Sequence, residues 1–209
     1  TITSGLLALD DEQLIFKDTN IASDWLEGKL DFGINYIDYS NSHGNMVFDN
    51  ISISLNDSTK IYLENIELTL ENNDNISELD ISGEIIYQDL QLDNILIKGV
   101  IQEKDVIINS AKFKLLNNYI KAQGKLNLEY LNWNTSINLD DFKYGEWAVL
   151  NGSVNLSSSL FFEDIQGNLN LSDIQIDSVF IHSANGEYSY NKGGFLNAGI
   201  NIFSNGYNG

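Results

Sequence analysis

The sequence predicts an all-β fold, and three observations support this prediction. Polar and apolar residues alternate over long stretches, clusters of Asn, Asp, Ser and Gly separate those stretches, and no long segment shows a helical period. A strand that alternates in this way has one apolar face and one polar face. The chain of 209 residues is long enough to bury a substantial core.

The individual strands follow from this alternation. In IYLENIELTL, residues 61–70, the apolar positions slip by one residue at Glu64-Asn65 and then resume. A slip of one residue is what a β-bulge or a tight turn produces. The apolar faces expected for four later strands are Ala122, Gly124, Leu126, Leu128 and Tyr130; Leu131, Trp133, Ile137 and Leu139; Leu150, Gly152, Val154 and Leu156; and Ile165, Gly167, Leu169 and Leu171. At Ser172-Asp173 the alternation shifts again, so that Ile174 and Ile176 return to the apolar face.

Turns are expected where small polar residues cluster, at residues 40–45, 55–60, 71–78 and 182–187. They divide the chain into twelve to fifteen strands of about six to twelve residues, joined by short connections that favour antiparallel neighbours. The segment from Ile21 to Lys29 is the one place that could hold a short helical turn. A loose Gly-x-apolar-x-apolar repeat, for example at Gly124, Gly152, Gly167 and Gly186, places a glycine on the apolar face near a strand start, where it permits bending or close packing.

Composition restricts the function. The net charge of −19 opposes binding to nucleic acids and to anionic membrane surfaces. There is no cysteine, so disulfides and thiolate metal sites are excluded. No apolar run approaches the ~20 residues of a membrane-spanning helix, and the first residues lack the basic and apolar regions that would predict a signal peptide. We expect residues 1–209 to be a single all-β unit.

Catalytic chemistry is not expected. His43 and His182 are far apart and show no metal-binding spacing, which favours solvated loop residues. The neighbouring carboxylates Asp10-Asp11 and Asp140-Asp141 would point in opposite directions in a strand and make poor acid and base pairs. The acidic segment 72–80 lacks the spacing of a calcium-binding loop. The chain is therefore predicted to be no enzyme and to hold no cofactor or metal.

The alternation leaves open what covers the apolar face. A second sheet, closure into a barrel, or a bent sheet that forms an apolar trough would each remove this surface from water. Periodicity alone does not distinguish them.

A family resemblance favours the trough. The stretches AQGKLNLEYLNWNTSINLDDF, LNGSVNLSSSLFFEDIQGNLNLSDIQI and SVFIHSANGEYSY, between Ala122 and Tyr190, resemble the AsmA-like superfamily and especially its TamB-type translocation and assembly module proteins. The resemblance covers about a third of the chain. It implies an elongated, strongly curved antiparallel sheet, a β-taco or β-groove, that is part of a larger, repeat-built periplasmic protein anchored in the inner membrane.

The same resemblance implies a function in phospholipid transport between the inner and outer membranes, in outer-membrane protein assembly, or in both. The expected partners are phospholipid acyl chains and a BamA-like outer-membrane protein of the TamA type, with no nucleic acid. The residues expected to line the groove are Leu126, Leu128, Ile137, Leu139, Val154, Leu156, Leu169, Leu171, Ile174 and Ile176. Two alternatives are a secreted or surface β-sandwich or jelly roll that binds carbohydrate or acts as an adhesin, and a lipopolysaccharide-transport-type β-jellyroll.

Overall fold

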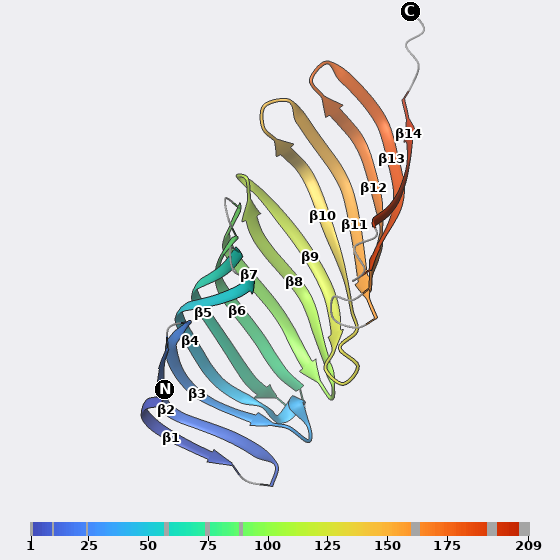
Figure 1. Ribbon diagram of the computed structural model, residues 1–209. Coiled ribbons are helices and arrows are strands. Elements are labelled where there is room, and N and C mark those ends of the chain that lie inside the picture. Colours follow the sequence, from blue (N-terminus) through green and yellow to red (C-terminus); the bar gives the residue numbers. More distant parts are fainter. Residues whose placement is uncertain are drawn as a thin grey trace, which may run out of the picture. The chain divides into compact units, whose positions relative to one another are not determined.

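The computed structural model describes residues 2–9, 11–23, 25–56, 59–73, 76–87, 90–159, 164–191 and 196–204. The chain divides into two compact units, Thr1–Leu115 (unit 1) and Leu116–Gly209 (unit 2). Each unit is described by itself (Figure 1).

Unit 1 is an antiparallel meander, in which each strand pairs with the next one along the chain. Its strands are β1 (Ile2–Leu9), β2 (Gln13–Ser23), β3 (Leu26–Asn35), β4 (His43–Asn56), β5 (Thr59–Asn73), β6 (Ile76–Tyr87), β7 (Leu90–Gln102) and β8 (Asp105–Leu115). A single turn of 3-10 helix, η1 (Tyr39–Asn41), lies between β3 and β4.

Unit 2 has the same meander topology. Its strands are β9 (Asn118–Asn127), β10 (Trp133–Tyr144), β11 (Ala148–Ser158), β12 (Asp164–Ile176), β13 (Val179–Asn191) and β14 (Leu196–Phe203). No α-helix occurs among the described residues of either unit. The predicted all-β, antiparallel class is therefore confirmed, although several strands are longer than expected, with β5 reaching 15 residues.

The two predicted shifts of alternation coincide with β-bulges. The register between β5 and β6 shifts between Glu64 and Glu67, where Asn65 has a φ of 52°. The register between β11 and β12 shifts beside Asp173, which has a φ of 49°. A bulge adds one residue to a strand, so residues of opposite parity before and after it lie on one face. The sequence-based interpretation of both sites is confirmed.

Bulge-like positions recur in neighbouring strands of each unit. Strand residues with positive φ are Gly5, Asp18, Gly44, Asn65, Gly83 and Asn94 in unit 1, and Asp141, Gly152 and Asp173 in unit 2. Bulges increase the local twist and bend the strand that carries them. The long strands of each unit accordingly curve along their length (Figure 1).

The core of unit 1 lies on one face of its sheet. Cross-strand partners share a face, so the ladder places Phe16, Phe32, Gly44, Leu70, Leu79, Gly99 and Ile108 in one row from β2 to β8. Phe32, Leu70 and Leu79 form its buried cluster. Gly44 lies between Phe32 and Leu70 in this row. Because it has no side chain, Phe32 can pack against Leu70 across it. Any Cβ at Gly44 would lie 2.3 Å from Asp31 O and clash.

The turn η1 lies against one end of this apolar face. The Ser77 Oγ atom in β6 lies 2.6 Å from Ser40 O and 2.5 Å from Ser42 O. The Asp38 Oδ1 atom accepts the Ser40 N–H as the N-cap of η1. The hydrogen bonds from Ser77 fasten the segment between β3 and β4 to β6. Ser40, Ser42 and Ser77 are all buried.

Several local predictions are wrong. Residues 21–29 form no helical turn in their described part, because Ile21 to Ser23 complete β2 and Leu26 opens β3. The cluster 182–187 is no turn and lies inside β13, where Asn185 and Glu187 face the polar side. Small polar residues suit the polar face of a strand as well as a turn. The expected turns at 55–60 and 71–78 centre on residues 57–58 and 74–75, which lie outside the described residues.

Candidate ligand-binding face

Nine of the ten predicted lining residues lie on strands of unit 2. Leu126 is in β9, Ile137 and Leu139 are in β10, Val154 and Leu156 are in β11, and Leu169, Leu171, Ile174 and Ile176 are in β12. Leu128 is the exception, because β9 ends at Asn127 and residues 128–130 form a turn. The prediction that Leu128 and Tyr130 continue the strand is wrong. The Asn127 side chain accepts the N–H groups of Glu129 and Tyr130 and turns the chain there.

The ladder brings the strand residues together on one face, which we call the apolar face of unit 2. One row across it contains Ala122, Ile137, Val154, Leu169, Gly186 and Ile200. A neighbouring row contains Leu139, Gly152, Leu171, Ala184 and Ile202. Beyond the bulge at Asp173, Ile176 pairs with Ala148 and Val179, and Ile174 pairs with Ile181.

The apolar face of unit 2 is only partly covered. Ile174 is buried, Ile176 is 36 % exposed, and the other eight predicted residues are half-buried. Exposure rises in the last strand, where Ile200 and Ile202 are 58 % and 61 % exposed. A contiguous apolar surface of this kind is typical of a ligand or partner site.

Sequence reasoning missed several members of the apolar face of unit 2. They are Phe142, Tyr144, Ile181, Tyr188, Tyr190, Ile200 and Ile202, whereas Leu150 and Ile165 were expected on an apolar strand face but were not named as lining residues. The corresponding face of unit 1, centred on Phe32, Leu70 and Leu79, was also not predicted as a site. The missed residues of unit 2 could have been found by continuing the alternation of polar and apolar residues through each bulge. The face of unit 1 could have been found from the same alternation before residue 120.

Glycines allow close packing at the centre of the apolar face of unit 2. The ring of Tyr188 lies over Gly167, where an added Cβ would meet Tyr188 Cζ at 2.8 Å and Asn155 O at 2.0 Å. The Tyr188 hydroxyl donates a hydrogen bond to Asn155 O over 3.1 Å. Partial burial raises the pKa of this phenol above its ordinary value. The predicted role of glycine in close packing is confirmed here, although Gly152, Gly167 and Gly186 lie within strands and not at their starts.

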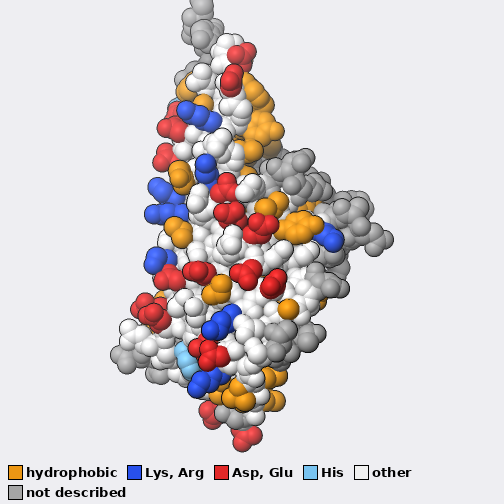
Figure 2. Space-filling view, turned by 90° about the vertical axis from the view of Figure 1, so that its left-hand side faces the viewer, with side chains coloured by type: hydrophobic (Ala, Val, Ile, Leu, Met, Phe, Trp, Pro, Cys, Tyr) orange, Lys and Arg blue, Asp and Glu red, His pale blue; other side chains and the backbone are white. Residues whose placement is uncertain are grey.

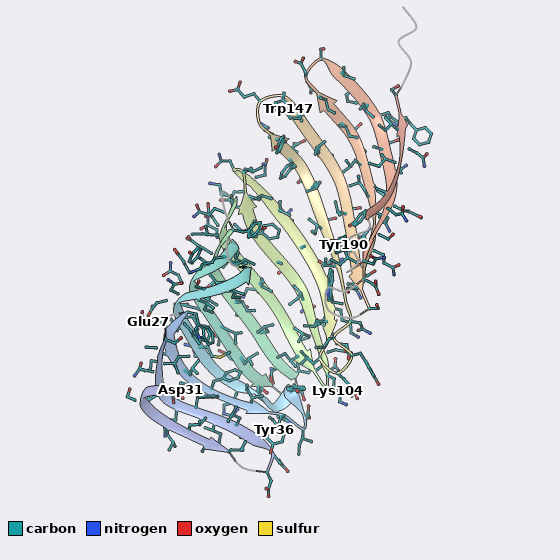
Figure 3. All side chains as sticks on the ribbon, in the orientation of Figure 1. Glu27, Asp31, Tyr36, Lys104, Trp147 and Tyr190 are labelled. Carbon is teal, nitrogen blue, oxygen red and sulfur yellow. The ribbon has the colours of Figure 1, made fainter. Side chains whose placement is uncertain are left out.

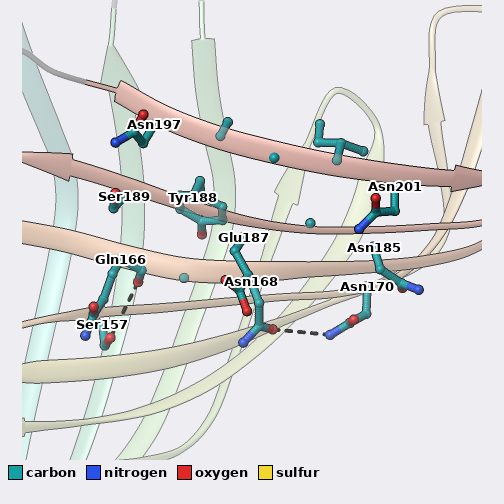
Figure 4. Close-up of a pocket in the computed structure, with 15 residues that line it drawn as sticks. Ser157, Gln166, Asn168, Asn170, Asn185, Glu187, Tyr188, Ser189, Asn197 and Asn201 are labelled. Carbon is teal, nitrogen blue, oxygen red and sulfur yellow. Dashed lines mark hydrogen bonds between the residues drawn. The ribbon is translucent and has the colours of Figure 1, made fainter.

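The opposite face of unit 2 is polar and rich in amides. Asn155 Nδ2 and Asn170 Nδ2 both donate to Asn168 Oδ1, over 2.8 Å and 3.2 Å. This face is hollowed over β11 to β14, with a volume of about 1390 Å³ (Figure 4). Among the residues at the hollow are Gln166, Asn168, Asn185, Glu187 and Asn201. None of the ten predicted lining residues borders this hollow.

The charged side chains lie mainly on the solvent-facing surface. Figure 2 shows acidic and basic side chains across the face that it presents, with hydrophobic side chains scattered among them. Lys29 pairs with Asp18 at 3.3 Å and Lys98 pairs with Asp80 at 3.1 Å, and all four side chains are exposed. Like charges also face each other across the ladder at Glu71 and Glu78.

The titratable groups are dispersed. Among the described residues, no three His, Asp or Glu side chains lie together as metal ligands would. His43 opens β4 beside Gly33, and His182 is an exposed residue of β13 and not of a loop. Asp141 is a bulge residue whose N–H donates to Asn151 Oδ1 over 2.8 Å. Within the described ranges, no helix is long and apolar enough to cross a membrane.

Comparison of the chain with models of known protein families, with curated proteins and with solved structures finds no match in any of the three.

Proposed function

We propose that the apolar face of unit 2 binds the acyl chains of phospholipids, and that the protein is a non-enzymatic, lipid-conducting segment of an AsmA-like, TamB-type protein. The observation that carries the proposal is the register of β9 to β14. It joins aliphatic side chains from neighbouring strands into rows on one face and leaves many of them half-exposed.

Acyl chains fit this face chemically. They are recognised by apolar contact alone, which the aliphatic rows offer without any polar group to orient a headgroup. Each large aliphatic side chain gains about 1.5–3 kcal/mol when it is fully removed from water. A bound chain laid across Val154, Leu169 and their neighbours would supply part of that burial.

In this proposal the sheet bends around its apolar face to form a groove. The positive-φ residues Asp141, Gly152 and Asp173 lie in three consecutive strands and supply local bends. The apolar face of unit 1 would contribute in the same way through its own rows. The proposed setting is the periplasm, with a parent anchored in the inner membrane and a BamA-like protein as partner.

A photo-crosslinking experiment tests this proposal. A photoreactive amino acid is placed at Leu171, on the apolar face, or at Asn170, its neighbour on the polar face. The full chain is expressed in a diderm bacterium, irradiated, and analysed by mass spectrometry. We expect a phospholipid adduct at position 171 and none at position 170.

No adduct at position 171, or equal adducts at both positions, would contradict the proposal. Circular dichroism of both variants controls for folding. Adducts to a protein at position 171 would indicate that a protein, and not lipid, covers this face. Lipopolysaccharide as the adduct would favour the transport-type β-jellyroll.

The polar hollow supports a second candidate, a carbohydrate-binding module. Its amides offer both donors and acceptors, as the hydroxyl groups of a neutral glycan require. Neighbouring strands lie about 4.8 Å apart. Asn168 in β12 and Asn185 in β13 therefore place amide donors and acceptors at about this spacing across the sheet.

Affinity electrophoresis through gels that contain dextran, xylan or starch tests this candidate. Retardation of the wild type in one of the gels is expected, with loss of retardation in Asn168→Ala/Asn185→Ala. Asn134→Ala is the matched control, because Asn134 lies on the same face outside the hollow. Free migration of the wild type in all three gels would exclude these glycans as ligands.

A further inference from the structure

One end of unit 2 carries a cluster of exposed large apolar side chains. The turn 145–147 joins β10 to β11, and the turn 177–178 joins β12 to β13. Tyr144, Trp147, Val179 and Phe180 at these two tips are 50 %, 52 %, 56 % and 50 % exposed. We call these four side chains the rim. Figure 3 shows Trp147 at the tip of its hairpin, with Tyr190 far from it along the strands.

The rim is held in place by specific contacts. The rings of Tyr144 and Trp147 meet edge to face, with centroids 5.4 Å apart and planes at 87°. Gly145 has a φ of 65°, and any Cβ there would lie 3.1 Å from the Trp147 ring. The Asp177 N–H donates to Trp147 O and fastens the two tips to each other. The indole is therefore positioned although half of it is exposed.

The polar face of unit 2 also becomes apolar at this end. Among the residues that the ladders place on that face, the large apolar ones are Val149, Phe180 and Phe203, which pair with Gln175 or Ser183. Elsewhere the ladders place Asn, Ser, Gln, Lys, Glu, Asp and Gly there. Tyr144 and Val179 lie on the apolar face, so the tips are apolar on both sides of the sheet.

The rim continues directly into the apolar face. Val179 pairs with Ile176, and Ile174 lies two residues before Ile176 on β12. The bulge at Asp173 keeps these residues on the same face as Leu171. An acyl chain that enters at the rim would meet apolar side chains continuously as far as Leu169 and Val154.

We propose that the rim inserts into the interfacial region of a zwitterionic phospholipid bilayer. Trp and Tyr favour this region, where an apolar ring and a polar group are both satisfied. The charge opposes binding to an anionic bilayer: unit 2 carries nine acidic and four basic residues, with Glu146 in one tip and Asp177 in the other. The destination of the lipid rests on the proposed function of the apolar face, whereas insertion of the rim does not.

Vesicle flotation tests the proposal. The full chain is mixed with unilamellar phosphatidylcholine vesicles and centrifuged through a density gradient. We expect the wild type to float with the vesicles. The affinity of Trp147→Ser/Phe180→Ser for the vesicles is expected to be lower by a factor of about ten or more. Tyr130→Ser is the matched control, because Tyr130 is 64 % exposed in the turn at the opposite end of the unit. It is expected to float like the wild type.

Fluorescence gives a second measurement. In a Trp25→Phe/Trp133→Phe background, Trp147 is the one remaining tryptophan. Phosphatidylcholine with brominated acyl chains is expected to quench its emission. Vesicles that contain phosphatidylglycerol are expected to bind the chain less, with the difference shrinking as NaCl is added.

Failure of the wild type to float, equal loss in the rim variant and in Tyr130→Ser, or unquenched Trp147 would overturn the proposal. A rim that docks on a protein would give the first of these results. The Leu171 crosslink distinguishes the two proposals. A lipid adduct without flotation would contradict only the proposal that the rim inserts into a bilayer. Flotation without an adduct would contradict only the proposal that the apolar face binds lipid.

Discussion

At the scale of single residues, hydrogen bonds and glycines hold the sheet of each unit in shape. The Ser77 hydroxyl is fully buried and is the donor that fastens the η1 segment to β6. Removing it leaves two buried carbonyl groups without this donor. A buried polar group that loses its partner costs about 1–3 kcal/mol.

We therefore expect Ser77→Ala to lower the free energy of unfolding by about 1–2 kcal/mol. Urea denaturation followed by circular dichroism measures the change. Ser189→Ala is the control, since Ser189 is exposed on β13. A midpoint unchanged by Ser77→Ala would show that the hydroxyl does not hold η1 in place.

Two glycines of unit 2 allow a matched comparison. Gly152 has a φ of 136°, and a Cβ there would lie 2.1 Å from Asn170 O. Around Gly199, a Cβ would meet no atom within 4 Å. Gly152→Ala should destabilise the protein by about 1–3 kcal/mol through strain and this clash. Gly199→Ala should stabilise it by about 0.4–1 kcal/mol by restricting the unfolded chain. Thermal unfolding of the two variants is the measurement, and equal effects would contradict the expected role of Gly152.

At the scale of elements, bulges decide which residues of a strand share a face. Asp173 adopts the left-handed conformation in β12 and brings Ile174 and Ile176 to the side of Leu171. Asp tolerates this conformation, glycine adopts it freely, and β-branched residues rarely do.

Asp173→Gly is therefore expected to be neutral or stabilising, and Asp173→Val to destabilise by about 1–2 kcal/mol. Denaturant midpoints of both variants provide the comparison. Asp164→Val, at the exposed start of the same strand, controls for loss of a carboxylate and for β propensity. A Val variant at 173 as stable as the wild type would argue against the bulge.

At the scale of the whole molecule, the net charge of −19 opposes compact folding. Carboxylates even face each other across the ladder, at Glu71 with Glu78 and at Glu64 with Glu84. Salt screens such repulsion between exposed groups. Raising NaCl from 0.05 M to 0.5 M is expected to increase Tm by about 2–4 °C, which corresponds to about 1 kcal/mol for a chain of this size.

The variant Glu71→Gln/Glu84→Gln provides the comparison for the effect of salt. It removes one carboxylate from each opposed pair, so it should melt higher at low salt and gain less from added NaCl. Calorimetry at both salt concentrations measures this. A Tm that falls with salt would refute charge repulsion as the destabilising effect.

The fold class could be predicted from the sequence because alternation is a local property. Apart from residues 128–132, the alternating segments became strands, and the slips at Asn65 and Asp173 became bulges. Turn composition was less informative, because Ser183, Asn185 and Glu187 look like a turn but occupy the polar side of β13. Leu128 was misplaced since Asn127 ends the strand with its own side chain.

The sequence by itself determined that the strands are one-sided, because the order of polar and apolar residues decides which side chains can share a face. The tertiary structure decided which strands pair, and in what register. It joined Ile137, Val154 and Leu169 into one row, set Tyr188 over Gly167, and brought Trp147 and Phe180 to one end of unit 2. Pairing is non-local: it depends on backbone hydrogen bonds and packing between residues distant in the chain, which no single segment specifies.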